Sequence, residues 1–450
     1  QKMKPFWESL RDGGFIEKEK FKRLVRAEEF TPSELAGFIE RQLVETRQST
    51  KAVADILKQA MPDTDIVYVK AKTVSAFRQD FDLIKVRELN DYHHAKDAYL
   101  NIVVGNTYFV KFTKDAAWFI SSSPDRSYNL KKMFQSDYDV ARNGEIAWKA
   151  GSAGTIKTVR NVMRKNSILF TRRSYDVSGG LFDQQLMKKG KGQVPVKSSE
   201  ERLRSIEKYG GYNKATGAYF VLVESEGKKG AKKRTMEYVP LYRKAELEAD
   251  EEKLRAYLEK EAGLKNPRIL IKKIKTDTLF NVDGFKMHLS GRTGKRLVFK
   301  GANPLLIDER QQRVLKKAGK VAEQVKANKN YQVSAYDGVT DEALEDIYHE
   351  FLNKLQKRPY RIRLEAQIET LKKGEARFTE LPTADKCRML YEILHLFQCN
   401  STLADLSGIA GPGNAGSLVL SNEIGKYDSI AIIHQSPTGI YEQEIDLNKL

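Results

Sequence analysis

The sequence is poor in cysteine and in long apolar runs. Its 450 residues include two cysteines, Cys387 and Cys399, which excludes a disulfide scaffold and indicates a reducing, cytoplasmic compartment. His395 lies between them, but all three fall in an apolar helical pattern, so core packing is favoured over a zinc site. No run of 18 apolar residues occurs, so we predict no transmembrane helix and no membrane partner.

Several common catalytic loops are also missing. The sequence contains no Walker loop, no G-x-G-x-x-G and no nucleophile elbow. Residues 411–414 (GPGN) are read as a plain loop, because no helix start with a lysine follows them. Arginine is absent after Arg388, where Lys426 and Lys449 are the remaining lysines.

Positive charge is abundant. Lysine and arginine number 78 against 60 acidic residues, which gives a net charge of +18 and a pI of about 9.5. A chain of this size with this charge favours a polyanionic partner. No basic amphipathic helix with a bulky apolar face stands out, so nucleic acid is favoured over a membrane surface.

Two histidines and a carboxylate meet in residues 90–100 (NDYHHAKDAYL). If this segment is a helix, His94 and Asp97 lie three residues apart on one face. A histidine and a carboxylate at one place can bind a divalent metal and handle a proton. Glu88 and Asp91 are nearby, but their positions do not obviously converge with this pair.

The first half of the chain reads as an α/β pattern. Thr31 and Glu34 have the spacing of a capping box that starts a long helix, which ends before residue 61. The β-branched segment 66–69 predicts a buried strand. Helices over 73–81 and 91–104 follow. A strand flanked by helices indicates a core layered on both faces.

The second half is richer in strands. We expect a strand at 218–223, a solvent-facing charged helix at 246–262, and short strands and turns over 417–446. Segments 268–272 and 278–287 predict a hairpin with an Asp-Gly turn. Residues 292–296 (RTGKR) read as a basic loop, and 344–371 and 385–397 as amphipathic helices. The predicted fold class is therefore α/β plus α+β.

Four of these segments resemble one family. Residues 90–100 resemble the third RuvC motif of the type II CRISPR RNA-guided DNA endonucleases, and 37–48 (GFIERQLVETRQ) resemble the helix before it. Residues 208–212 (KYGGY) and 433–441 (IHQSPTGIY) are similar to signatures of the C-terminal domain that reads DNA.

The resemblance implies an order of domains. It places the end of an HNH domain and a linker at 1–30, a partial RNase H-like RuvC segment at 31–176, and a mixed, β-rich domain at 177–450. That last domain would recognise the protospacer-adjacent motif (PAM), the short DNA sequence beside the target.

The resemblance also implies a nuclease site. Asp97 and His94 would bind Mg²⁺, or Mn²⁺, with His94 as the base that activates water and His93 as a structural neighbour. The family's first two RuvC segments would precede Gln1. We therefore expect a fragment, split or processed product that is inactive alone and is completed by the N-terminal remainder. A cleavage-dead nucleic-acid-binding module is the alternative.

Guide RNA (crRNA with tracrRNA, or a single guide) and target DNA are the implied partners. In the family, the loop after a glycine pair grips a target-strand phosphate. The matching loop here is Asp183, Gln184 and Gln185, where Asp183 would repel a phosphate. Further contact candidates combine basic and aromatic side chains: Arg41, Arg47, Arg160, Arg164, Lys165, Arg358, Tyr360, Arg361 and Arg363.

The PAM-reading residues depart from the family pattern. Members that recognise two guanines place an arginine pair just before the I-H-Q-S strand. The matching stretch, 418–423 (LVLSNE), contains no arginine. Ser421, Asn422, Lys426 and Gln435 remain as polar candidates. We therefore predict a motif other than a simple guanine pair, one that contains adenine, with Asn422 and Lys426 as the best readers.

Overall fold

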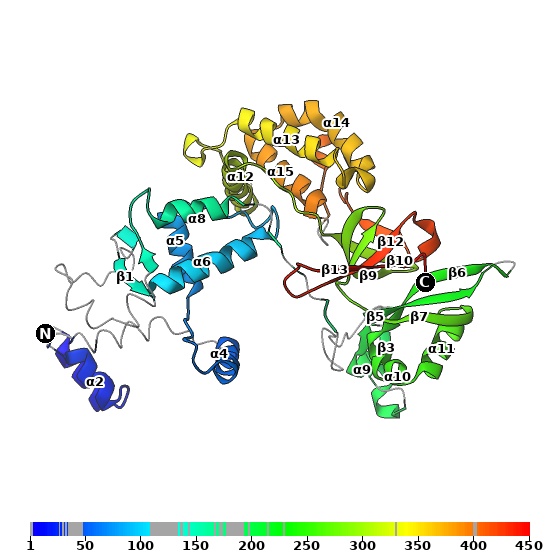
Figure 1. Ribbon diagram of the computed structural model, residues 1–450, viewed down its shortest axis with the longest axis horizontal. Coiled ribbons are helices and arrows are strands. Elements are labelled where there is room, and N and C mark those ends of the chain that lie inside the picture. The colour runs from blue at the N-terminus through cyan, green and yellow to red at the C-terminus, as the bar shows by residue number, and fades with distance from the viewer. Residues whose placement is uncertain are drawn as a thin grey trace. The chain divides into compact units, whose positions relative to one another are not determined.

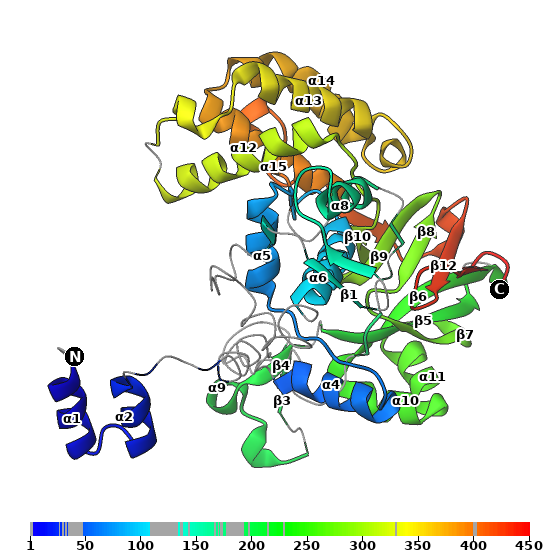
Figure 2. The same cartoon turned by 60° about the vertical axis from the view of Figure 1, so that its left-hand side comes forward.

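The computed structural model divides the chain into two compact units (Figures 1 and 2). One unit comprises residues 1–83 and 96–165, and the other comprises residues 84–95 and 166–450. The structure describes residues 3–26, 28, 31, 34, 48–108, 134–135, 138–142, 145–165, 168–169, 171, 174–176, 193–196, 199–213, 216–227, 230–328, 331–398 and 403–450. None of the helices in these ranges combines the length and apolar character needed to cross a lipid bilayer.

The first unit begins with two short helices, α1 (Lys4–Asp12) and α2 (Lys18–Val25). They are separated at the Gly13–Gly14 pair, where Gly14 takes a positive φ of 72°, which glycine adopts without steric cost. Arg11 lies over the ring of Phe21, 4.4 Å from its centroid.

The predicted capping box is confirmed. Thr31 N donates to Glu34 Oε2 and Glu34 N donates to Thr31 Oγ1, at 2.9 and 3.2 Å. Arg26 also pairs with Glu34 at 2.9 Å. Together these contacts lower the pKa of Glu34 to about 2, the Arg26 hydrogen bond being the largest cause.

The first unit is held together by an aromatic core. Its further elements are α4 (Gln48–Ala60), α5 (Ala71–Asp80), α6 (Tyr92–Tyr108), α8 (Thr155–Met163) and the antiparallel pair β1 (Tyr138–Arg142) and β2 (Glu145–Trp148). Helix α6 continues into the second unit at its N-terminal end. Phe77, Leu100, Val104, Trp148 and Val159 are almost fully buried in one cluster. Trp148 Nε1 donates to the carbonyl oxygen of Phe134 at 3.0 Å, so the indole is satisfied inside the core.

Residues 66–69 form no strand, which corrects the prediction of a buried strand there. Instead Val69 packs against α6 at Gly105, where an added Cβ would stand 2.7 Å from Val69 Cγ2. A β-branched run needs a neighbouring strand for its backbone hydrogen bonds, and the described part of the chain provides none beside it. The glycine in α6 allows close contact with an irregular segment instead.

In the second unit a three-stranded antiparallel sheet has the order β6 (Lys232–Pro240), β5 (Gly217–Glu226), β7 (Lys265–Lys275). Side chains of β5 alternate between two cores, as strand geometry requires. Tyr219, Val221 and Val223 pack with α10 (Lys244–Ala249) and α11 (Glu251–Lys260). Phe220 and Leu222 join the larger core on the other side.

A six-stranded antiparallel sheet forms the second layer. Its order is β11 (Leu418–Ser421), β10 (Arg296–Gly301), β9 (Phe285–Thr293), β8 (Leu279–Val282), β12 (Ile430–Gln435), β13 (Glu442–Asp446). The predicted Asp-Gly turn between β8 and β9 is confirmed: Asp283 and Gly284 both have positive φ, 52° and 88°, as a type I′ hairpin needs.

Four helices complete this unit: α12 (Glu309–Ala327), α13 (Asp341–Leu355), α14 (Glu365–Glu380) and α15 (Thr383–Gln398). Helices α13, α14 and α15 lie side by side in both views (Figures 1 and 2). Cys387 is fully buried in α15, which confirms core packing for this cysteine, and burial raises the pKa of its thiol to about 12.

Short elements connect these parts. They are the pair β3 (Gln193–Pro195) and β4 (Gly211–Asn213), helix α9 (Ile206–Tyr209), and 3₁₀ turns at Glu201–Leu203, Leu241–Arg243, Ala335–Asp337, Tyr360–Ile362, Ser407–Ile409 and Ile424–Lys426. The coarser form of the predicted fold class, a mixture of helices and sheets, is confirmed. Every strand pair in the described ranges is antiparallel.

Candidate functional site

The histidine pair lies in the first turn of α6, as predicted. Asn90 starts the helix, because its side-chain oxygen accepts from Tyr92 N at 3.0 Å and satisfies a free helix-end donor. Asn90 Nδ2 donates to the carbonyl of Leu305 at 2.7 Å. This amide therefore anchors the start of the helix to the chain before α12.

The two histidines have different surroundings. His93 Nδ1 donates to the carbonyl oxygen of Asn90 at 2.7 Å, and burial lowers the pKa of its ring. The rings of His93 and His94 are stacked at a tilt, with centroids 4.1 Å apart. His93 is thus tied to the backbone, whereas the ring of His94 has no backbone hydrogen bond among the described residues.

Asp97 follows on the same helix, three residues after His94. Its carboxylate forms an ion pair with the guanidinium of Arg78 from α5. The Arg78 side chain is 12% exposed and that of Asp97 is 27% exposed. Arg78 could not be identified from the sequence, because its role depends on how α5 packs against α6 and no local pattern marks it.

The donor set for a divalent metal is small. Carboxylate oxygen and imidazole nitrogen both suit such an ion, so Asp97 and His94 have the right chemistry. Across the ranges that the structure describes, no three His, Cys, Asp or Glu side chains converge. A two-metal phosphodiester site needs more carboxylates than this, so these residues fit part of such a site.

Three of the predicted PAM readers, Ser421, Asn422 and Lys426, lie at or just after the end of β11, whereas Gln435 is the last residue of β12. Each of the four has a partner. Asn422 is 8% exposed and donates from Nδ2 to Glu237 Oε1 at 3.0 Å. Ser421 Oγ accepts from the backbone N of Glu423 at 3.2 Å. Asn422 is therefore held against β6 and is not extended toward solvent.

The other two candidates are also engaged. Lys426 is 3.5 Å from Glu423, which pairs with Lys233 as well. Gln435 donates to Glu442 on the neighbouring strand β13 at 2.9 Å. Both partners are carboxylates on exposed or half-exposed side chains, so these contacts are of the kind that contributes little to stability.

The basic cluster before α14 divides into surface and core residues. Tyr360 is 5% exposed, and its hydroxyl donates to the carbonyl of Asn303 at 3.2 Å. Arg363 forms an ion pair with Asp283 of the β8–β9 turn. Arg358 and Arg361 remain exposed. This corrects the prediction for Tyr360, which is a core residue and offers no face for stacking bases.

Three contact candidates lie at α8, where the described residues place them on the surface. Arg160 donates to the carbonyl of Phe81 at 3.2 Å, and Arg164 and Lys165 are exposed at the helix end. The remaining candidates lie outside the described residues: Arg41, Arg47, Asp183, Gln184, Gln185.

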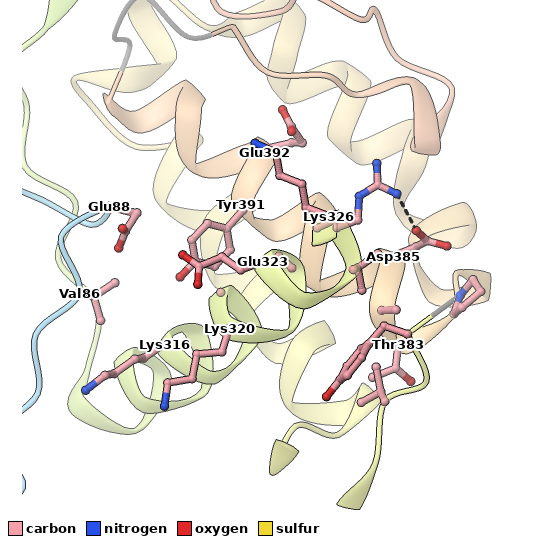
Figure 3. Close-up of a pocket in the computed structure, with 18 of the residues that line it drawn as sticks. Val86, Glu88, Lys316, Lys320, Glu323, Lys326, Thr383, Asp385, Tyr391 and Glu392 are labelled. Atoms are coloured by element: carbon pink, nitrogen blue, oxygen red, sulfur yellow. Dashed lines mark hydrogen bonds and ion pairs between the residues drawn. The ribbon is translucent and has the colours of Figure 1, made fainter. Parts of the chain in front are cut away.

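A cavity of about 1400 Å³ lies beside α12 and α15 (Figure 3). Lys316 and Lys320 line it together with Glu323 and Glu88. Acidic and basic side chains are interspersed around it, so its electrostatics do not favour a polyanion.

Comparisons with known proteins identify the family. The sequence profile described as the Cas9 RuvC domain matches residues 47–174. The profile described as the PAM-interacting domain of CRISPR-associated endonuclease Cas9 matches residues 178–443, more than half of the chain. The chain belongs to the Cas9 family and contains sequence from both of these domains.

Two curated relatives are CRISPR-associated endonucleases Cas9. The protein from Streptococcus mutans serotype c is 29% identical over an alignment that covers 100% of this chain and 35% of the relative. The protein from Listeria innocua serovar 6a is 35% identical over 60% of this chain and 22% of the relative. The chain thus spans about a third or less of the length of these relatives.

Proposed function

We propose that this chain is part of a guide-RNA-directed CRISPR endonuclease that cuts double-stranded DNA. The observation that carries the proposal is the match to both Cas9 domains in succession on one chain, with His94 and Asp97 on one helix inside the first match. The chain would supply residues that cut the displaced, non-target strand, and the domain that recognises the PAM.

Each residue of the motif has a separate role in this proposal. Asp97 would hold a divalent ion, Mg²⁺ in the first instance, which when bound activates water and stabilises charge on the scissile phosphate. His94, with its ring free of backbone bonds in the described contacts, would take the proton from the attacking water. Asn90 and His93 would fix the start of α6, and Arg78 the direction of the Asp97 carboxylate.

The partners follow from the same proposal. The N-terminal remainder of the nuclease would complete the metal site and an RNase H-like core over residues 31–176. Guide RNA would pair with the target, and residues 177–450 would contact the flanking DNA. Residues 1–30 would be the end of the HNH domain and its linker. The expected location is the bacterial cytoplasm, where guide RNA and invading DNA meet.

The test is Asp97→Ala in the complete, guide-loaded nuclease. We expect cutting of the non-target strand to be lost while guide and target binding are retained, because a single metal ligand is removed. Strand-specific cleavage and DNA-binding assays measure the two effects. Asp80→Ala, an exposed aspartate at the end of α5, is the matched control and should cut normally. Full cutting by Asp97→Ala with unchanged metal dependence would contradict the assignment.

A further inference from the structure

The β9–β10 hairpin places cations next to the predicted PAM readers. Its turn is Gly294–Lys295, with Gly294 at a φ of 57°, the positive value that two-residue hairpin turns need. Arg296 pairs with Thr293 on the other strand of this hairpin and with Ser421 on β11. The basic loop at residues 292–296 therefore lies directly beside β11, the strand that contains no arginine.

A cavity of about 410 Å³ opens between this hairpin and β6. Asn422 and Glu237, joined by their hydrogen bond, line it on the β6 side. Arg292 and Arg296 line it on the hairpin side. The cavity thus combines fixed amide and carboxylate groups with two guanidinium groups, which is a set suited to hydrogen-bonding groups of a base edge.

The acidic residues around the cavity already have partners. Glu261 forms an ion pair with Arg243, and Glu237 accepts from Asn422. Burial raises the pKa of Glu237, and Lys295 and Arg292 are close enough to oppose that shift. In contrast, Arg292, Lys295 and Arg296 have no ion pair among the described residues, so these cations are available to a ligand.

Arg292 differs from its neighbours in being held in place. Its guanidinium lies over the Tyr238 ring, 3.0 Å from the centroid, and its Nη1 donates to the carbonyl of Gly294 at 3.4 Å. Arg292 is half-buried, whereas Lys295 and Arg296 are exposed. A planar guanidinium fixed by stacking loses little freedom on forming two parallel hydrogen bonds, which is what base recognition requires.

We infer that Arg292 contacts a guanine of the flanking DNA motif through its major-groove edge, and that Lys295 and Arg296 hold adjacent phosphates. This inference rests on the proposed function. It moves base recognition from the segment before β12 to the β9–β10 hairpin. Asn422 then acts as a positioning residue that fixes Glu237 and β6 behind the contact.

Binding of the complete guide-loaded nuclease to targets with randomised flanks tests this inference. Arg292→Lys keeps the charge but loses the paired donors, so preference for guanine at one position should fall by roughly 5- to 150-fold. Arg296→Ala should weaken binding about equally for all flanks and reduce the log–log salt slope by about 0.9. Arg255→Lys on α11, an exposed arginine away from the cavity, should change neither measurement.

Tyr238 provides a second pair of variants if Arg292→Lys proves unstable. Tyr238→Leu removes the ring beneath Arg292 and should relax the same flank position, while Tyr238→Phe keeps the ring and the preference. The inference is overturned if Arg292→Lys and Tyr238→Leu both retain the parental preference. An unmodified enzyme with no flank preference at all would contradict the proposed function itself.

Discussion

At the scale of single residues, two adjacent histidines in α6 have distinct surroundings. We therefore expect one to contribute to the stability of the fold and the other to the cleavage reaction. His93 is bonded to the Asn90 carbonyl and partly buried, whereas His94 is its stacked neighbour. We expect His94→Ala to abolish cutting of the non-target strand with little change in thermal stability. His93→Ala should lower the free energy of unfolding by about 1 kcal/mol, the usual value of a lost hydrogen bond.

Strand-specific cleavage and thermal melting of both variants in the complete nuclease check this prediction. Equal loss of cutting with no stability change in His93→Ala would show that the roles assigned to the two histidines are wrong.

The sequence indicated which residues could bind a metal, but not which side chains they contact in the fold. The spacing of His94 and Asp97 on one helix could be read from the sequence, because helical periodicity is local. The ion pair of Asp97 with Arg78 could not, since it depends on two helices meeting. Tyr360 lies in a basic run that suggested base stacking, but its ring packs edge-on against Phe397. Local composition does not reveal which side of such a run faces the core.

At the scale of elements, a buried lysine joins two helices. Lys386 of α15 is 2% exposed and lies 2.8 Å from Glu345 and 3.3 Å from Asp341, both on α13. We expect Lys386→Ala to lower the free energy of unfolding by about 2 kcal/mol, because it removes hydrogen bonds to charged groups and leaves Glu345 unpaired. Chemical denaturation measures the effect.

A surface pair provides the control for this prediction. Lys372 pairs with Glu369 within α14 at 2.8 Å, and both side chains are about half exposed. Lys372→Ala should lower the free energy of unfolding by less than about 1 kcal/mol. If both substitutions lower the free energy of unfolding equally, the burial of Lys386 adds nothing to its contribution to stability.

The elements themselves were predicted where the signal was local. The Asp-Gly hairpin of β8 and β9 and the strand at 218–223 are confirmed. The region 246–262 was predicted to face solvent, but Leu247, Leu254 and Leu258 are fully buried. Its dense charge obscured an apolar stripe at helical spacing. Residues 268–272 pair with β5 and not with β8. Both edges of β8 are occupied, by β9 and β12, and these pairings between distant strands cannot be read from local sequence.

For the whole molecule, the charge of +18 predicts salt-sensitive binding to DNA and RNA. Each phosphate that is neutralised contributes about 0.9 to the slope of log affinity against log salt on duplex DNA. Affinity of the chain for duplex DNA, measured from roughly 50 to 200 mM salt, should therefore fall steeply. A flat response would rule out phosphate contacts as the main source of affinity.

A second prediction at this scale concerns activity of the isolated chain. Asp97 and His94 are too few ligands for a two-metal site, and no other group of three or more ligands converges in the described ranges. We expect the purified 450-residue chain to leave plasmid DNA uncut in magnesium. Nicking that a chelator abolishes would reveal a complete site, and the proposal that a remainder is required would fail.

The central strand β5 constrains how this protein can change over evolution. All residues from Ala218 to Ser225 are buried, because β5 serves one core with each face. A mutation there disturbs two layers at once, whereas Thr293, Lys295 and Arg296 at the hairpin tip are exposed. Sequence drift is therefore permitted at the tip and opposed in the strand. Under the proposed function, lineages can adjust their phosphate contacts by altering a few tip residues while inheriting the same platform.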